Sequence, residues 1–141
     1  MKFKLACCSI LLASSFTCSA KAYISDDLTC PTADAIRSEG LSFSFPVLPK
    51  FYISAHQSQY NTAKEWTFTL AFIHANDTHK ATEKGMSLIK RLQGKPQPEQ
   101  SEDNNWLCAY EIPGEEYLAL AIHSATPLGQ VGIKQLVNKH Q

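Results

Sequence analysis

The sequence has no excess of charge of either sign and no hydrophobic run long enough to cross a membrane. Thirteen lysine and arginine residues balance thirteen aspartate and glutamate residues in a chain of 141. The uncharged stretch at residues 5–16 is shorter than the roughly 20 apolar residues of a spanning helix, and no other apolar run approaches that length. Without a basic cluster, the chain is also a poor candidate for binding nucleic acid or anionic membranes.

The motifs of the common enzyme classes are absent as well. The sequence contains no GxSxG, HExxH, GxxxxGK[ST] or GxGxxG pattern. It contains no CxxCH, which excludes covalent attachment of a c-type haem. The five histidines form no HxH or HxxxH pair, so we expect no metal site. We therefore expect a protein that is not an enzyme, with an enzyme of unrecognised type as the alternative.

The chain does have a leader in three parts. Residues 1–4 are basic, residues 5–16 are uncharged, and the segment SAKA at residues 19–22 has the small-x-small form that signal peptidase cleaves. This order predicts a signal peptide at residues 1–22 and a single mature domain at residues 23–141. We therefore expect an exported protein, periplasmic or secreted, with no transmembrane segment in the mature chain.

Removal of the leader leaves two of the five cysteines, Cys30 and Cys108. It also lowers the 13 basic residues to 10 against 13 acidic ones, a net charge of −3 with histidine neutral. Two cysteines in an oxidising compartment usually pair, which predicts a disulfide between them. The disulfide would close a loop of about 78 residues and stabilise the fold by about 4 kcal/mol. The alternative is a reactive thiol at Cys30, just before Pro31 at the start of a predicted helix.

Alternation of apolar and polar residues predicts the strands. The clearest case is residues 65–74, where Trp66, Phe68, Leu70 and Phe72 share one face. A period of two is typical of a sheet with one buried face. The same pattern predicts further strands at residues 41–45, 51–60, 106–112 and 117–124, the last two joined as a hairpin through the turn Pro113-Gly114.

Helical periodicity is found at residues 31–39 and 79–93, and more weakly at residues 126–139. Asp77 or Thr78 would cap the second helix, and Thr126-Pro127 would begin the third. Together with hairpin-like connections, this predicts an α+β fold: a mainly antiparallel sheet of about five strands with two or three helices packed on one face.

Three local sequences resemble those of a known family. They are Cys30-Pro31 at the start of the domain, Ile73-His74 at the end of the aromatic strand, and the segment WLCAY at residues 106–110. The whole length is similar to a family of small exported bacterial proteins of unassigned function, some of which are named haemin-binding proteins. The resemblance implies haemin as a ligand, but it carries over no ligand residues.

Haem iron needs an axial His, Tyr, Met or Cys beside an apolar slot. His74 is expected to continue the apolar face of the aromatic strand, and His123 to lie opposite the leucine face of the last strand. With Tyr110 on the tryptophan-bearing strand, these are the candidate haem ligands. Each histidine is otherwise explained as a strand-end or surface residue.

Two functions of different classes follow from the sequence. The first is a non-enzymatic binding protein for haemin or another flat apolar ligand. The alternative is an envelope or secreted protein-interaction module with no small-molecule ligand, which would present an exposed apolar patch to a protein partner.

Overall fold

The structure, a computed structural model, describes residues 28–140 and contains one six-stranded sheet and three helices in that range. The predicted signal peptide at residues 1–22 lies outside the described residues. The elements, in chain order, are α1 (Ala33–Glu39), β1 (Phe43–Leu48), β2 (Phe51–Ser58), β3 (Trp66–His74), α2 (Thr78–Ile89), β4 (Glu99–Gln100), β5 (Trp106–Tyr110), β6 (Leu118–His123) and α3 (Gln130–Lys139).

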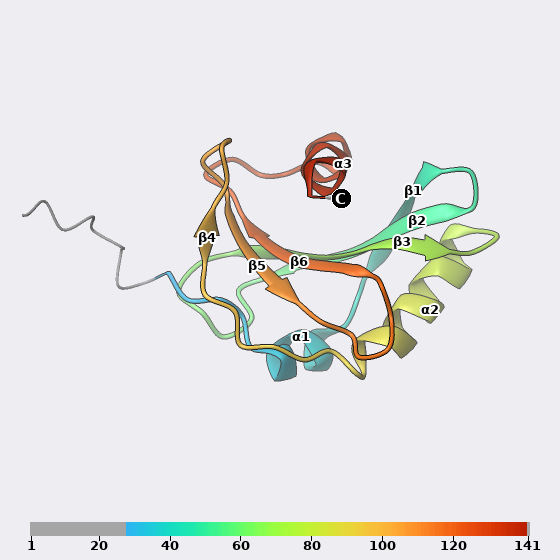
Figure 1. The fold of residues 1–141 in the computed structure, drawn as a ribbon, viewed down its shortest axis with the longest axis horizontal. Coiled ribbons are helices and arrows are strands. Elements are labelled where there is room, and N and C mark those ends of the chain that lie inside the picture. The colour runs from blue at the N-terminus through green and yellow to red at the C-terminus, as the bar shows by residue number, and fades with distance from the viewer. Residues whose placement is uncertain (1–27, 141) are drawn as a thin grey trace, which may run out of the picture.

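The sheet is antiparallel throughout, with the order β1-β2-β3-β6-β5-β4 (Figure 1). The predicted α+β class is therefore confirmed, with one strand more than expected. The additional strand, β4, is a two-residue segment that pairs with the start of β5. It lies in a polar stretch whose prolines and lack of apolar residues give no strand pattern. No helix in residues 28–140 is long and apolar enough to cross a membrane.

The helices cover both faces of the sheet. Figure 1 shows α1 and α2 below the sheet and α3 above it. On α3, Ile133 and Val137 pack against Phe45 and Ile53, while Leu136 packs with leucine and isoleucine side chains of β5 and β6. The prediction that the helices share one face therefore applies to α1 and α2 and is wrong for α3. The physical reason is that both faces of the sheet are apolar, and each has to be covered.

A bulge in β3 changes the direction of its last side chains. Trp66, Phe68 and Leu70 enter the core under α1 and α2, as the alternation predicts. The register with β2 then shifts, and Phe72 takes a positive φ of 62°. Because the extra residue reverses the alternation, Ile73 enters the lower core and Phe72 packs toward α3. The expectation that Phe72 continues the aromatic face is therefore wrong.

The helix starts follow the capping rules in two cases of three. Thr32 accepts a hydrogen bond from the Ala35 N–H at the start of α1, and Asp77 accepts one from the Lys80 N–H at the start of α2. The predicted cap at Asp77 is confirmed. The third helix begins at Gln130 after Gly129, with no side-chain cap, so the predicted start at Thr126-Pro127 is wrong.

A disulfide joins Cys30 to Cys108, with a Cα–Cα distance of 5.8 Å, which confirms the predicted pairing. Both cysteines are buried, and the bond attaches the chain just before α1 to the middle of β5. Two further contacts secure the same region: the Tyr110 hydroxyl donates to the Pro31 carbonyl, and the Arg37 guanidinium donates to the Leu92 carbonyl. This set of contacts holds α1 on the lower face of the sheet.

Replacing both cysteines with alanine is expected to lower the free energy of unfolding by about 2–4 kcal/mol, because the unfolded chain regains the entropy of a loop of 78 residues. Urea unfolding followed by circular dichroism would measure the loss. An unchanged urea midpoint would contradict the anchoring role of the disulfide.

Gly85 permits the close approach of α2 to the sheet. A Cβ at this position would lie 2.7 Å from Leu41 Cδ1 and 3.2 Å from Ile73 Cδ1, and both side chains are buried. Gly85→Ala is therefore expected to destabilise the protein by about 1–2 kcal/mol, although alanine is the better helix former. The matched control is Gly132→Ala on α3, where a Cβ meets only the end of the half-buried Leu128 side chain. Equal urea midpoints for the two variants would contradict this account.

Candidate functional site

A row of three exposed side chains crosses β1, β2 and β3 near the ends of these strands. Phe51 pairs with Leu48 of β1 on one side and with His74 of β3 on the other. Directly opposite residues of an antiparallel sheet present their side chains on the same face. The Phe51 and His74 rings meet edge to face, with centroids 5.4 Å apart. We call Leu48, Phe51 and His74 the hairpin row.

The hairpin row lies on the side of the sheet that carries α3. Phe51 is two residues from Ile53, which packs under α3, so both point the same way. In Figure 1 the β1–β2 hairpin extends past α3, which leaves this corner of the sheet uncovered. Leu48 is 57% exposed and Phe51 is 37% exposed. The expectation that His74 continues the Trp66 face is therefore wrong, because the bulge at Phe72 reverses the alternation.

The sequence that forms this corner departs from a regular hairpin. β1 continues through Pro46, past the end of the strand predicted at residues 41–45, because an edge strand tolerates a residue without an N–H. A second register shift lies between Pro46 and Leu48, and Lys50 has a positive φ of 65° in the turn. The Lys50 carbonyl accepts a hydrogen bond from the Ala75 N–H, which ties the turn to the end of β3.

A cleft of about 470 Å³ lies beside the end of β3 and the start of α2. Within it, Lys84 Nζ donates to the backbone carbonyl of His74, and Lys80 Nζ lies 2.9 Å from Glu83 Oε2. The hydrogen bond between Lys80 and Glu83 raises the pKa of the lysine and lowers that of the glutamate. Because the pair is exposed to solvent, it adds little stability. The cleft is lined by His74, Ala75, Asn76, Lys80, Glu83 and Lys84.

His123 lies at the other end of β3 from His74. The register of β3 with β6 places Thr67 opposite Ile122, so His123 is next to the first residue of β3. Its ring lies 5.6 Å from the Trp66 ring. Since β3 has nine residues, the two candidate histidines are separated by about 25 Å. They cannot ligate the same haem.

The orientation of the His123 ring is set by a hydrogen bond. Nδ1 lies 2.8 Å from the Glu65 carbonyl, which can only accept, so Nδ1 carries a proton and Nε2 is the nitrogen left to face a ligand. Histidines that bind metals are commonly oriented in this way. The adjoining cavity, however, is about 160 Å³, below the range of roughly 300–1,000 Å³ that is typical of small-molecule sites.

Tyr110 belongs to the core. Its ring meets the Phe68 ring edge to face at 5.9 Å, and its hydroxyl donates to the Pro31 carbonyl. Burial raises the pKa of this hydroxyl, so the neutral form is strongly favoured. The structure thus brings none of the three candidate ligands together: His74 and His123 lie at opposite ends of the sheet, and Tyr110 is buried.

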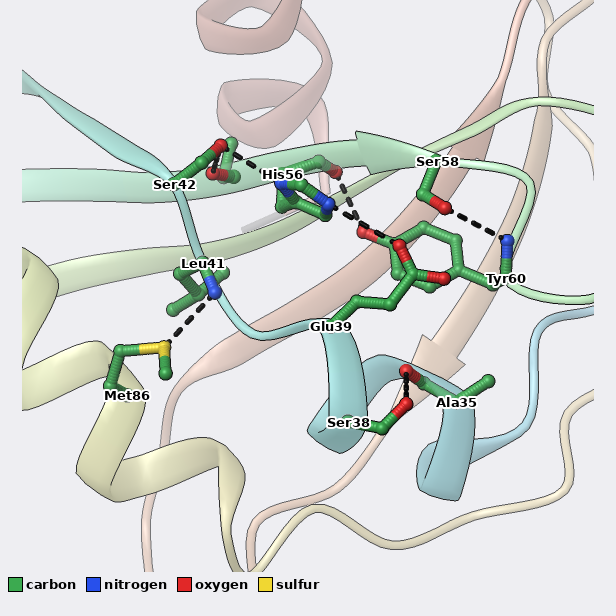
Figure 2. Close-up of polar contacts among 10 residues, drawn as sticks. Ala35, Ser38, Glu39, Leu41, Ser42, His56, Ser58, Tyr60 and Met86 are labelled. Carbon is green, nitrogen blue, oxygen red and sulfur yellow. Dashed lines mark hydrogen bonds and ion pairs between the residues drawn. The ribbon is translucent and has the colours of Figure 1, made fainter.

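A polar cluster that sequence reasoning missed lies between α1 and β2. His56 Nδ1 is 2.9 Å from Ser42 Oγ, and His56 Nε2 is 3.4 Å from Glu39 Oε2 (Figure 2). The order Ser, His, acid is that of a hydrolase triad. The nearby backbone N–H groups of Leu41 and Ser42 are already bonded, to Met86 Sδ and the Ala55 carbonyl, so neither can stabilise an oxyanion. The cluster instead joins the α1–β1 connection to β2.

The cluster could not be found from spacing alone. Glu39, Ser42 and His56 come from three different elements or connections, and no motif links them in the sequence. Figure 2 also shows the Tyr60 hydroxyl, which donates to the His56 carbonyl at 2.8 Å. This bond closes the turn after β2 over the cluster.

A cleft of about 530 Å³ opens between the start of α1 and residues 92–97. Its walls are largely apolar and contain no histidine or tyrosine, and its cysteine, Cys30, is in the disulfide. Arg37 crosses it to donate to Asp34 and the Leu92 carbonyl. The cleft therefore offers no axial ligand for haem iron. In residues 28–140 no three His, Cys, Asp or Glu side chains gather to hold a metal ion.

These features define a small disulfide-linked α+β protein with a six-stranded antiparallel sheet between two helical layers. Residues 29–136 match the domain of unknown function DUF4949, and the chain belongs to this family. The expectation of a family of unassigned function is thereby confirmed. No curated protein and no solved structure matches the chain.

Stability is expected to fall as the pH rises above about 10. Burial raises the pKa of both Tyr60 and Tyr110 above the ordinary tyrosine value of about 10. Between the pKa of tyrosine in the unfolded chain and its higher pKa in the folded chain, the unfolded chain loses phenolic protons that the folded chain retains. Unfolding is therefore favoured as the pH increases. Each tyrosine should lower the free energy of unfolding by about 1 kcal/mol between pH 10 and 11.

Urea midpoints measured from pH 8 to 11 would test this dependence. Tyr110→Phe should be less stable at pH 8, through loss of the bond to Pro31, and should show a shallower decline above pH 10. Tyr52→Phe at a half-buried position is the control. If stability declined with pH as steeply in Tyr110→Phe and Tyr60→Phe as in the parent, the attribution of the decline to these two tyrosines would be refuted.

Proposed function

We propose that the protein is an exported, non-enzymatic binding protein that holds a flat apolar ligand on the hairpin row, and that haemin is this ligand. The observation that carries the proposal is the contact between the exposed His74 imidazole and the Phe51 ring in a part of the sheet that α3 leaves uncovered. The proposed export rests on the leader at residues 1–22.

The hairpin row supplies the two elements that haem recognition needs. His74 offers an imidazole at the surface, and Phe51 and Leu48 offer exposed apolar area on the same face. When bound, haem would contribute an iron that accepts one histidine nitrogen. The chain's own residues would orient the imidazole through its edge-to-face contact and cover one side of the ligand.

The other candidate positions support the proposal less well. The His123 imidazole is well oriented, but its cavity of about 160 Å³ cannot enclose a macrocycle. Tyr110 is 5% exposed, and its hydroxyl is already bonded to Pro31. His74 therefore ranks first among the ligand candidates and His123 second.

The alternative function, a protein-interaction module, has an observation of its own. Phe43 is a further exposed aromatic residue of β1, and Met86 of α2 is exposed beside the start of the same strand, where its sulfur accepts from the Leu41 N–H. Exposed apolar side chains beside an edge strand are typical of protein contacts. Capture of a defined envelope protein that is lost in Phe43→Ser would favour this alternative.

Titration with haemin, followed by absorbance in the Soret region, tests the proposal. The protein is expected to give a saturable spectral shift near one equivalent, and His74→Ala should weaken binding by about tenfold or more. His140→Ala, at an exposed position after α3, is the matched control and should bind as the parent does. Loss of the shift in His123→Ala alone would move the site to the Trp66 end of the sheet, and no shift with the parent would overturn the function.

A further inference from the structure

Acidic residues are missing from two long segments of the chain. No aspartate or glutamate occurs between Glu39 and Glu65, and none occurs after Glu116. The fold brings these segments together, because they contain β1, β2, β6 and α3. These elements therefore bring lysines and no acids to the side of the sheet covered by α3, where Lys139 pairs with Asp103 of the β4–β5 connection. On the other side, α1 and α2 carry several acids: Asp34, Glu39 and Glu83.

Two exposed apolar residues of that side lie together at the tip of the β1–β2 hairpin. Leu48 is 57% exposed and Phe51 is 37% exposed, with only Pro49 and Lys50 between them. Figure 1 shows this hairpin at a corner of the molecule, with its turn pointing away from the sheet. The tip can therefore reach a flat surface without obstruction from the rest of the fold.

Two lysines flank this apolar tip. Lys50 lies in the turn itself, and Lys134 of α3 places its ammonium 5.7 Å from the Phe45 ring centroid, farther along β1. Neither lysine forms an ion pair with another residue of the described chain. The tip thus combines two apolar side chains with nearby cations, and the same segments contain no acid. This combination is complementary to a partner that is both anionic and apolar.

We infer that the β1–β2 hairpin docks the exported protein on an anionic lipid surface. Leu48 and Phe51 enter the boundary between headgroups and acyl chains, and Lys50 lies among the lipid phosphates, with Lys134 facing the same surface. The sequence by itself argues against an anionic membrane, because it contains no basic cluster. The inference rests on the fold, which places Lys50 and Lys134 near the exposed Leu48 and Phe51. This inference goes beyond ligand binding and does not require His74.

Sedimentation with lipid vesicles tests the inference. The protein starting at residue 23 is expected to bind vesicles of phosphatidylcholine containing about one quarter phosphatidylglycerol, and to bind pure phosphatidylcholine much more weakly. Raising the salt from about 0.1 M to about 0.5 M should reduce binding, since the charge contribution is screened. Leu48→Ser with Phe51→Ser should abolish it, and Lys50→Glu should weaken it by about tenfold.

Matched controls separate docking from general effects of charge and surface apolarity. Val131→Ser removes another exposed apolar residue, and Lys90→Glu reverses an exposed lysine beyond α2 on the opposite side, so both should bind as the parent does. His74→Ala should also bind vesicles normally, whatever its effect on haemin. Light scattering on each variant would detect a dimer, which is the case in which a second copy of the chain occupies the hairpin tip.

Three results would overturn the inference. The first is equal binding to neutral and anionic vesicles, or no binding to either kind. The second is unchanged binding in the Leu48 and Phe51 double variant that retains the circular dichroism spectrum of the parent. The third is a dimer that this double variant dissociates while vesicles do not sediment the parent. Loss of haemin binding in His74→Ala with intact vesicle binding would leave the inference standing, so the two proposals fail separately.

Discussion

The bulge in β3 is the constraint on which both halves of the structure depend. Up to Leu70 the strand buries its large side chains under α1 and α2 and turns small or hydroxyl-bearing ones toward α3. Thr69 can be buried there because its hydroxyl donates to the Leu120 carbonyl. The extra residue at Phe72 then lets one strand supply an aromatic ring to the upper layer and still place Ile73 in the lower core. A regular strand would have buried His74 or exposed Ile73.

The lower layer is joined to the sheet by bonds as well as by apolar packing. The disulfide, the Tyr110–Pro31 hydrogen bond and the Arg37–Leu92 contact all act on the short helix α1 or the chain just before it. A seven-residue helix has little stability of its own. The cross-links therefore explain how α1 remains in place. In residues 28–140 no disulfide attaches α3, which is held mainly by the packing of Ile133, Leu136 and Val137, together with an ion pair between Lys139 and Asp103.

This asymmetry separates a structural side from a side available for binding. The histidine-containing cluster of Glu39, Ser42 and His56 lies on the lower side and serves to connect α1, β1 and β2. The hairpin row lies on the upper side, together with Lys134, which forms no ion pair with another described residue. The proposed haemin contact and the inferred lipid contact use different chemistry on that side: an imidazole nitrogen in one case, and apolar insertion with phosphate neutralisation in the other.

The sequence by itself determined the local elements, the α+β class and the disulfide. These depend on short-range features, such as the alternation from Trp66 to Leu70 and the Asp77 cap, or on a count that left two cysteines to pair. Only the tertiary structure decided which way His74 points, that α3 lies opposite α1 and α2, and that two acid-free segments share one side of the sheet. A single inserted residue in a strand reverses the direction of every later side chain. The helix that covers a face is selected by packing between residues far apart in the chain. No local sequence pattern therefore predicts either feature.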